Sequence, residues 1–393
     1  MQLPISLNTL SILVFIILVI YLLYRNRKKI EFQKIGSIPI ISMMRTHLGV
    51  KFIDKIGKKY SKFFKILGYI GMVVGYLGMI AMFLLIAMSF VKLFTQPEAA
   101  SAVSPVIPGV RIPGAQIFVP FWYGIIALFI VVVIHELGHG LIAKSHKTKI
   151  LNTGFILFLI LPGAFVEPDE KKLAKRKVAV QNSVYAAGPW FNVLLSAVVM
   201  ILLIFVITPA HNSLANYEGF AFSNLDNNSP AMTAALPINA TYTEVNNIPI
   251  NDVADLSKEL SKYSPKETIT LTTKNNQDYS LTLGNHPEDN NTAYIGILNL
   301  RNVRGHQSVF KEIFYVIIDI IANLFFWIYV LSLGIGAANL LPIGPLDGGR
   351  LLITLLKSKF KEKKAKMIAA KVSALTILFL IAALIIPIVK AII

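Results

Sequence analysis

Two histidines and a glutamate lie within five residues of one another in an otherwise apolar segment. His135, Glu136 and His139 occur in the run VVVIHELGHGLIA, residues 131–143. In a helix, residues four apart share one face, so both imidazoles can meet one metal ion while the glutamate reaches a water bound to it. Ionisable groups in an apolar span cost roughly 2.5–3.5 kcal/mol each, so three of them need a partner. The spacing predicts one zinc ion per chain, although so short a pattern also arises by chance.

An aspartate far along the chain could complete the ligand set. Asp347 lies between a leucine and two glycines in SLGIGAANLLPIGPLDGGR, residues 332–350. The glycines and prolines break the preceding apolar run and leave the chain flexible enough to bend an acid toward a metal. We expect Asp347 to be the third ligand. The alternative is an aspartate that caps a helix at the membrane surface.

The composition is that of an integral membrane protein. Of its 393 residues, 55% are hydrophobic and 15% are charged, and the mean hydropathy is +0.63, unlike a soluble globular protein. The formal net charge of +17 does not indicate nucleic-acid binding, because the basic residues fall between apolar runs rather than along one solvated face. The chain has no cysteine, so any metal must take nitrogen or oxygen ligands.

Six apolar runs reach the length of about 20 residues that a bilayer span requires. The basic loops between them are expected in the cytoplasm, which places both termini outside and sends the histidine helix inward. His135 then lies roughly 12 Å from the cytoplasmic end of its helix, so the site is buried but nearer the cytoplasm. The first run has no small-residue cleavage site and is interpreted as a retained anchor. The predicted spans are residues 8–24, 66–95, 120–143, 184–208, 313–341 and 367–392.

A segment after the histidine helix is predicted to enter the membrane without crossing it. Residues 153–168 are apolar but are interrupted by Pro162 and Gly163 and are too short to cross as a helix. A re-entrant β-hairpin would offer a free strand edge to an extended substrate, with Gly163 and Phe165 beside it; a packed interfacial loop is the alternative. Asn192 opens the next span and needs a polar neighbour, either near the hairpin and substrate or between two helices.

Residues 211–305 are polar and acidic, with short alternating runs. GFAFSNL from Gly219 predicts a strand, TITLTT and YSLTL predict a hairpin, and Asp252 to Tyr263 predicts a capped helix. We expect a small α+β extracytoplasmic domain within an α-helical polytopic membrane protein of about six transmembrane helices. The predicted parts are an anchor helix with a basic cytoplasmic segment (1–65), a membrane core (66–210), this domain (211–305) and a second membrane core part (306–393).

Three motifs in order make the chain resemble the site-2 proteases, which are intramembrane zinc metalloproteases. IHELGHGLIA matches the HExxH helix of that family, AGPWFN its AGPxxN motif, and NLLPIGPLDGGR its NxxPxxxLDG motif. The resemblance implies that His135, His139 and Asp347 hold zinc, that Glu136 is the general base, and that Asn339 assists near the substrate or the intermediate. None of these positions departs from the family pattern.

The inserted domain is similar to the PDZ domains of membrane proteases, although Asn239 and Ala240 replace the usual glycine-aspartate turn. A PDZ groove binds peptide ends by strand addition, so this domain would screen substrates or act as a steric plug. The expected partners are a transmembrane protein substrate and the lipid bilayer of the cell membrane.

Two other functions are compatible with parts of the pattern. A membrane metal-ion transporter would also place His and Asp residues in its spans, but it has no need of a glutamate between the histidines. A catalytically inactive scaffold would have no need to keep base and ligands together. Regulated hydrolysis of transmembrane substrates therefore remains the function predicted from the sequence.

Overall fold

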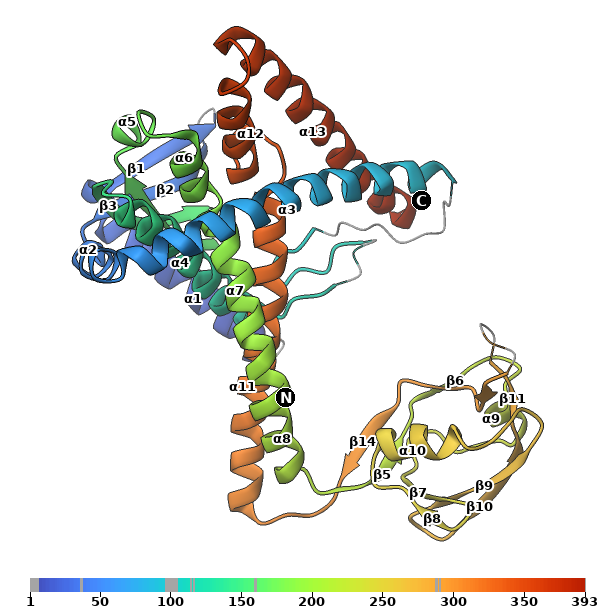
Figure 1. Cartoon of the computed structure of the whole chain (residues 1–393). Helices are drawn as coiled ribbons and strands as arrows, with labels where there is room; N and C mark the ends of the chain where they lie inside the picture. The colour runs from blue at the N-terminus through green and yellow to red at the C-terminus, as the bar shows by residue number, and fades with distance from the viewer. Residues whose placement is uncertain are drawn as a thin grey trace. The chain divides into compact units, whose positions relative to one another are not determined.

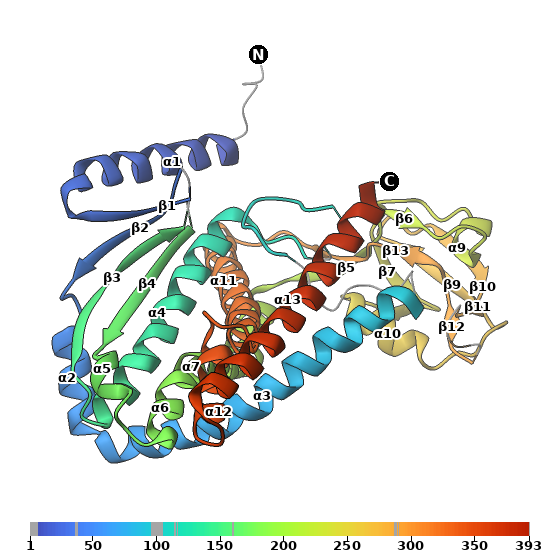
Figure 2. The same ribbon diagram turned by 90° about the horizontal axis from the view of Figure 1, so that it is seen from above.

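The computed structural model describes residues 7–35, 38–95, 105–113, 115, 117–158, 161–286, 289 and 291–392. The chain divides into two compact units. The first unit runs to Ile204 and resumes at Ala322, and the second unit is Phe205–Ile321. Both units are drawn in Figures 1 and 2. Each is described by itself below.

Within the described residues, five helices are long and apolar enough to cross a membrane. Two of them are irregular. α7 continues through a π-helical turn, Leu203–Ile207, into α8, Thr208–Leu214, and α13 contains Pro387. A sixth apolar helix, α1, Leu7–Arg25, coincides with the first predicted span but is shorter than the others. The chain is therefore a helical multi-pass membrane protein, and a sixth span stays a prediction. The five helices are α3 Ser61–Thr95, α4 Phe121–Ser145, α7 Ala187–Leu202, α11 Val309–Asn339 and α13 Glu362–Ile392.

A four-stranded antiparallel sheet lies beside α4 in the first unit (Figure 2). The predicted hairpin is present as the last two strands of the order β1-β2-β3-β4. The first two strands come from the basic segment that follows the predicted anchor helix, for which the sequence predicted no strands. β1 pairs with β2, and β2 pairs with β3 far along the chain, with Met44 opposite Phe155, so no local pattern indicates this second pairing. The strands are β1 Ile30–Ile35, β2 Ile38–Thr46, β3 Ile150–Phe158 and β4 Leu161–Pro168.

Short helices fill the space between the sheet and the long helices of the first unit. The amphipathic helix α2, Val50–Lys59, buries Ile53 against α4, where Gly140 allows the approach. The start of α7 packs beside the end of α11, since Ser332 Oγ donates to the Asn192 carbonyl oxygen at 2.9 Å (Figure 1). These contacts fix the register of the helices around the site. The remaining short helices are α5 Glu170–Leu173, α6 Val178–Tyr185 and α12 Asp347–Lys357.

The second unit carries a β-rich module with its own hydrophobic core. Its main sheet has the order β10-β9-β7-β5-β14, with β8 paired to β7. The predicted hairpin is confirmed, because Tyr279 lies opposite Leu271, and so is the capped helix, because Asp252 accepts a hydrogen bond from the Asp255 amide at 2.7 Å. The elements are β5 Tyr217–Ala221, β6 Asn224–Leu225, α9 Pro230–Thr233, β7 Tyr242–Val245, β8 Ile248–Pro249, α10 Val253–Leu260, β9 Thr268–Thr273, β10 Asp278–Thr282, β11 Gly284–Asn285, β12 Ala293–Tyr294, β13 Ile297–Leu298 and β14 Arg301–Arg304.

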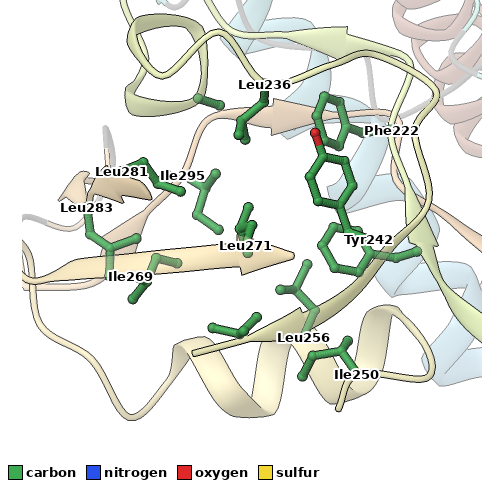
Figure 3. Packing of buried hydrophobic residues seen from close by; sticks show 13 residues of the cluster. Phe222, Leu236, Tyr242, Ile250, Leu256, Ile269, Leu271, Leu281, Leu283 and Ile295 are labelled. Atoms are coloured by element: carbon green, nitrogen blue, oxygen red, sulfur yellow. The ribbon is translucent and has the colours of Figure 1, made fainter. Parts of the chain in front are cut away.

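Figure 3 shows this core, where Tyr242 meets Phe222 and aliphatic side chains from β9, β10 and α10 close around them. The Tyr242 and Phe222 rings stack with centroids 5.4 Å apart. Leu271 and Ile269 point inward from alternate positions of β9 and are fully buried, as the period of two in TITLTT predicts.

Candidate metal centre and catalytic site

Two imidazoles and a carboxylate converge at the centre of the first unit. His135 and His139 lie one turn apart on α4, with their Nε2 atoms 3.3 Å from each other. Asp347 Oδ2, from the first residue of α12, lies 3.1 Å from His135 Nε2 and 3.3 Å from His139 Nε2. The structure therefore brings together the three residues that were predicted as ligands, although Asp347 follows His135 by 212 positions.

The spacing of these three donors suits a tetrahedral metal ion. Zinc held at bond lengths of about 2.0–2.1 Å separates its ligand atoms by roughly 3.3 Å, close to the three distances found here. Two imidazole nitrogens and one carboxylate oxygen are also a catalytic zinc set, which leaves a fourth position for water or substrate. The cluster is nearly closed to solvent, since His135 is 6% exposed. The residues present thus fit the metal that their sequence pattern predicted.

Groups behind the histidines fix which ring nitrogen faces the cluster. His139 Nδ1 lies 2.8 Å from the Val184 carbonyl oxygen. A carbonyl can only accept, so Nδ1 carries the proton and Nε2 keeps its lone pair for a metal. The Val184 carbonyl is available because α6 ends one residue later, at Tyr185, and the last carbonyls of a helix lack intrahelical partners.

Asn192 performs the corresponding task for His135. Its side-chain amide lies behind the ring, with Nδ2 3.2 Å from His135 Nδ1, and its Oδ1 has no hydrogen-bond partner among the described residues. Half a turn of the amide exchanges the two atoms, and Oδ1 then accepts from Nδ1–H and leaves Nε2 for the metal. Asn192 is completely buried, so it lies behind the site rather than on a wall that substrate could touch.

Gly188 is the point where α7 approaches the cluster most closely. A Cβ at this position would lie 2.3 Å from His139 Nε2 and 2.4 Å from His135 Nε2. No side chain fits there, because real Cβ atoms do not approach other heavy atoms so closely. The motif AGPWFN therefore needs glycine at this position, because any side chain would overlap the two histidine nitrogens.

Glu136 lies one residue round the helix from His135 and points toward the sheet. Its Oε2 accepts a hydrogen bond from the backbone N–H of Val166 on β4 at 2.9 Å. Ligand atoms of Glu136, His135 and His139 lie within 4.8 Å of one another. The carboxylate is thus close enough to the cluster to act on a water held there, and it is oriented by the backbone of the hairpin.

A cavity of about 800 Å³ opens onto these residues. Phe165 and Asn339, both predicted near substrate, line it together with Glu136 and Asp347. Asn339 ends α11 and donates to the Ile335 carbonyl oxygen at 3.0 Å. Gly163 lies elsewhere, in the lining of a separate apolar cavity of about 310 Å³ between α1, α4 and the sheet.

Comparison with known proteins agrees with the geometry. The sequence model of "Peptidase family M50" matches residues 123–380. This chain belongs to peptidase family M50. That family is the site-2 protease family, so the resemblance drawn from the three motifs is confirmed.

Curated relatives of this M50 chain include archaeal and bacterial proteins. An uncharacterized protein of Methanocaldococcus jannaschii is 28% identical over 95% of this chain and 93% of its own length. A "putative zinc metalloprotease" of Staphylococcus aureus is 22% identical over 61% of this chain, and that match spans 65% of the relative, just under two thirds. Another protein of that name, from Fusobacterium nucleatum, is 25% identical over 60% of this chain and 88% of its own length.

The mouth of the cavity in this M50 chain is charged. Arg350, one turn after Asp347 on α12, pairs with Glu170 at 3.0 Å. Arg45 on β2 pairs with Glu167 at 3.5 Å, and both residues also line the cavity. Such exposed pairs contribute little to stability, but they keep the entrance polar and wetted. Water therefore has a route to a site that is otherwise surrounded by apolar helices.

A neutral histidine closes the end of α4. His146 is buried beside Ser183, with His146 Nε2 3.3 Å from Ser183 Oγ. Burial, followed by the charges of Lys65 and Arg176, lowers the pKa of His146 from 6.5 to about 4. The imidazole is thus uncharged at neutral pH.

Sequence reasoning missed four contributors to the M50 site. The Val184 carbonyl and the Val166 amide are backbone groups, whose role no side-chain pattern reveals. Gly188 belongs to a motif that was recognised, but only the approach of α7 to α4 shows what the glycine does. The residues of β2 on the cavity wall, such as Arg45, depended on a strand pairing that the sequence did not announce.

Proposed function

We propose that this chain is an intramembrane zinc metalloprotease of the site-2 type, which hydrolyses peptide bonds in transmembrane segments of other proteins. The observation that carries the proposal is the convergence of two Nε2 atoms and a carboxylate oxygen at 3.1–3.3 Å beside Glu136. Membership of peptidase family M50 and the metalloprotease names of the bacterial relatives support the same chemistry.

Each residue of the site has one task in this reaction. His135, His139 and Asp347 would hold the metal, with the two rings oriented by Asn192 and the Val184 carbonyl. Zinc bound there would supply a water of lowered pKa and would polarise the scissile carbonyl.

Glu136 takes the proton of the attacking water and then delivers it to the leaving amine. The Val166 amide holds the Glu136 carboxylate on the side of the hairpin. Asn339, at the end of α11 on the cavity wall, is proposed to hydrogen-bond the substrate or the intermediate.

The substrate is proposed to bind as an unwound strand along β4. A transmembrane helix hides its amides in internal hydrogen bonds, so the segment to be cut must first open. β4 ends the strand order of its sheet and lies next to Glu136, so it can take up the freed backbone groups by strand addition. Helix-breaking residues near the cleavage site favour such opening.

The proposed arrangement in the cell follows from charge. The basic loops would lie in the cytoplasm, with the charged mouth of the cavity nearer that side and the β-rich module of the second unit outside. That module, residues 217–304, is proposed to be PDZ-like and to screen substrates by binding an exposed peptide end. The domain boundaries 1–65, 66–210, 211–305 and 306–393 belong to this proposal.

Two variants of the purified protein, reconstituted in liposomes, test the function. The substrate is a synthetic transmembrane peptide with a central helix break and a fluorophore pair. We expect Glu136→Gln to abolish cleavage while zinc content stays near one per chain, and Asp347→Ala to lose both. Undiminished cleavage by Glu136→Gln would refute the base assignment. Zinc flux across the bilayer without any cleavage by the unmodified protein would favour a transporter instead.

A further inference from the structure

Val166 lies on the outer edge of the sheet that borders the site. β4 is the last strand in the order β1-β2-β3-β4, and Val166 is the register partner of Thr153 on β3. In an antiparallel pair, residues alternate between those whose N–H and C=O face the partner strand and those whose groups face away. Which of the two applies to Val166 decides what its amide can bind.

The direction of the Thr153 carbonyl shows which way the Val166 backbone groups face. The Thr153 carbonyl oxygen accepts from Thr46 Oγ1 at 3.3 Å, so this carbonyl faces β2 and not β4. The pair Thr153 and Val166 is therefore of the kind without mutual hydrogen bonds, and the Val166 N–H and C=O both face the open edge. By the same alternation the backbone of Ala164, two residues earlier, faces that edge as well.

The outward N–H of Val166 is engaged by the catalytic carboxylate. It donates to Glu136 Oε2 at 2.9 Å, and a hydrogen bond to a charged acceptor is about twice as strong as a neutral one. Close packing of α4 on β4 holds the two groups at this distance. A Cβ on Gly140 would lie 3.0 Å from Ile53 Cδ1 and 3.2 Å from Val166 Cγ1, so a side chain there would press on both neighbours by a few tenths of an ångström.

We propose that the Val166 backbone amide is a positioning group for Glu136, and that a bound substrate strand therefore begins its pairing at the Ala164 amide. This inference rests on the proposed proteolytic function. The two outward N–H groups then have different tasks. The Val166 N–H orients Glu136, and the Ala164 N–H is the donor for the substrate strand. Pro162, two residues before Ala164, also faces the edge but has no N–H. It therefore offers the substrate strand no hydrogen-bond donor.

Matched proline substitutions separate the two tasks. Val166→Pro and Ala164→Pro each remove one outward N–H from an edge strand, where proline is tolerated. We expect Val166→Pro to lower kcat about 10- to 100-fold with KM within twofold, since bonds to charged groups have that weight. Ala164→Pro should raise KM while kcat changes little. Val166→Ala keeps the amide, so its kcat separates the loss of the N–H in Val166→Pro from the loss of the valine side chain.

A second variant guards against misfolding of the proline variants. Gly140→Ala leaves every amide in place but adds a methyl group 3.2 Å from Val166 Cγ1, so it should lower kcat in the same direction by a much smaller factor. Zinc content is measured for each variant, and all should retain about one zinc per chain. An unchanged kcat in both Val166→Pro and Gly140→Ala, with zinc bound, would overturn the proposal. Failure of Glu136→Gln to reduce cleavage would instead refute the proposed function itself.

Discussion

The β-rich module of the second unit buries mainly aromatic and aliphatic side chains, whereas the first unit also buries asparagines and exposes many of its large apolar side chains. Tyr242 and Leu271 are fully buried in the β-rich module. In the first unit Asn182 and Asn192 are fully buried, while Leu77 is 64% exposed. The module is therefore built for water, and the helical unit is built for lipid, in which the interior can hold polar groups that hydrogen-bond one another.

This difference decides what a substitution does in each unit. Removing bulk from the module opens a cavity in a hydrophobic core. Adding bulk or removing a polar partner in the helical unit acts on the ligand geometry. The predictions below test whether the two kinds of damage stay separate.

Gly188→Ala should have the largest effect and should be confined to the first unit. Its Cβ would lie 2.3–2.4 Å from both ligand nitrogens, so at least one ring must leave its position. We expect zinc affinity to fall by more than about 100-fold, beyond what loss of an outer contact costs, and cleavage to be lost. Zinc titration by competition with a chelator measures this. Gly334→Ala is the control, because no atom lies within 4 Å of its Cβ.

Leu271→Ala should damage the second unit and spare the metal site. Deleting this fully buried side chain costs about 2–5 kcal/mol of local stability. Hydrogen exchange of the β9 and β10 amides in the full chain should accelerate accordingly, while zinc affinity stays unchanged. Ile248→Ala, at a position that is 40% exposed, should leave exchange nearly as it is. A loss of zinc in Leu271→Ala would show that the units are not independent.

Asn192→Leu should weaken zinc binding by about 10- to 100-fold, as other partners of metal-bound histidines do. Leucine has nearly the same size but cannot accept from His135 Nδ1–H. Asn182→Leu is the matched control, since Asn182 is equally buried but donates to Tyr76 Oη rather than to a histidine. Equal zinc affinities in the two variants would contradict the role of Asn192.

Asp252→Ala should have the smallest effect. It removes the side chain that caps α10, which costs about 1 kcal/mol. Exchange of the first α10 amides should quicken by roughly fivefold, without change in the main sheet or in zinc binding. Ser257→Ala, on the exposed face of the same helix, should not accelerate exchange. Unaltered protection in Asp252→Ala would mean that tertiary packing alone holds the start of α10.

The sequence indicated the parts of each unit that depend on local patterns. HELGH places two ligands and a base on one helical turn, and alternation in TITLTT identifies a half-buried strand. LDGG could be matched to a family motif, so Asp347 was predicted beside the two histidines, where the structure places it. In the module, the capping aspartate at 252 marked the helix start within one residue.

The rest depended on contacts between distant segments. The pairing of β2 with β3 joins the two hairpins into one sheet, but apolar and polar residues do not alternate along residues 38–46 clearly enough to indicate it. Asn192 was expected near substrate, and only the crossing of α7 and α4 shows that it lies behind His135. The tasks of the Val166 and Val184 backbones follow from register and from a helix end, which side-chain identities do not encode.

The distance in sequence between His135 and Asp347 also affects the order of events during synthesis. The N-terminal part of a chain leaves the ribosome first, and contacts between residues that are distant in sequence form late. His135 and His139 enter the membrane well before α12 exists, because 212 positions separate His135 from Asp347. We expect the unfinished chain to hold zinc weakly and to cut nothing. The cluster of His135, His139 and Asp347 would thus be completed only after α12 has been synthesised.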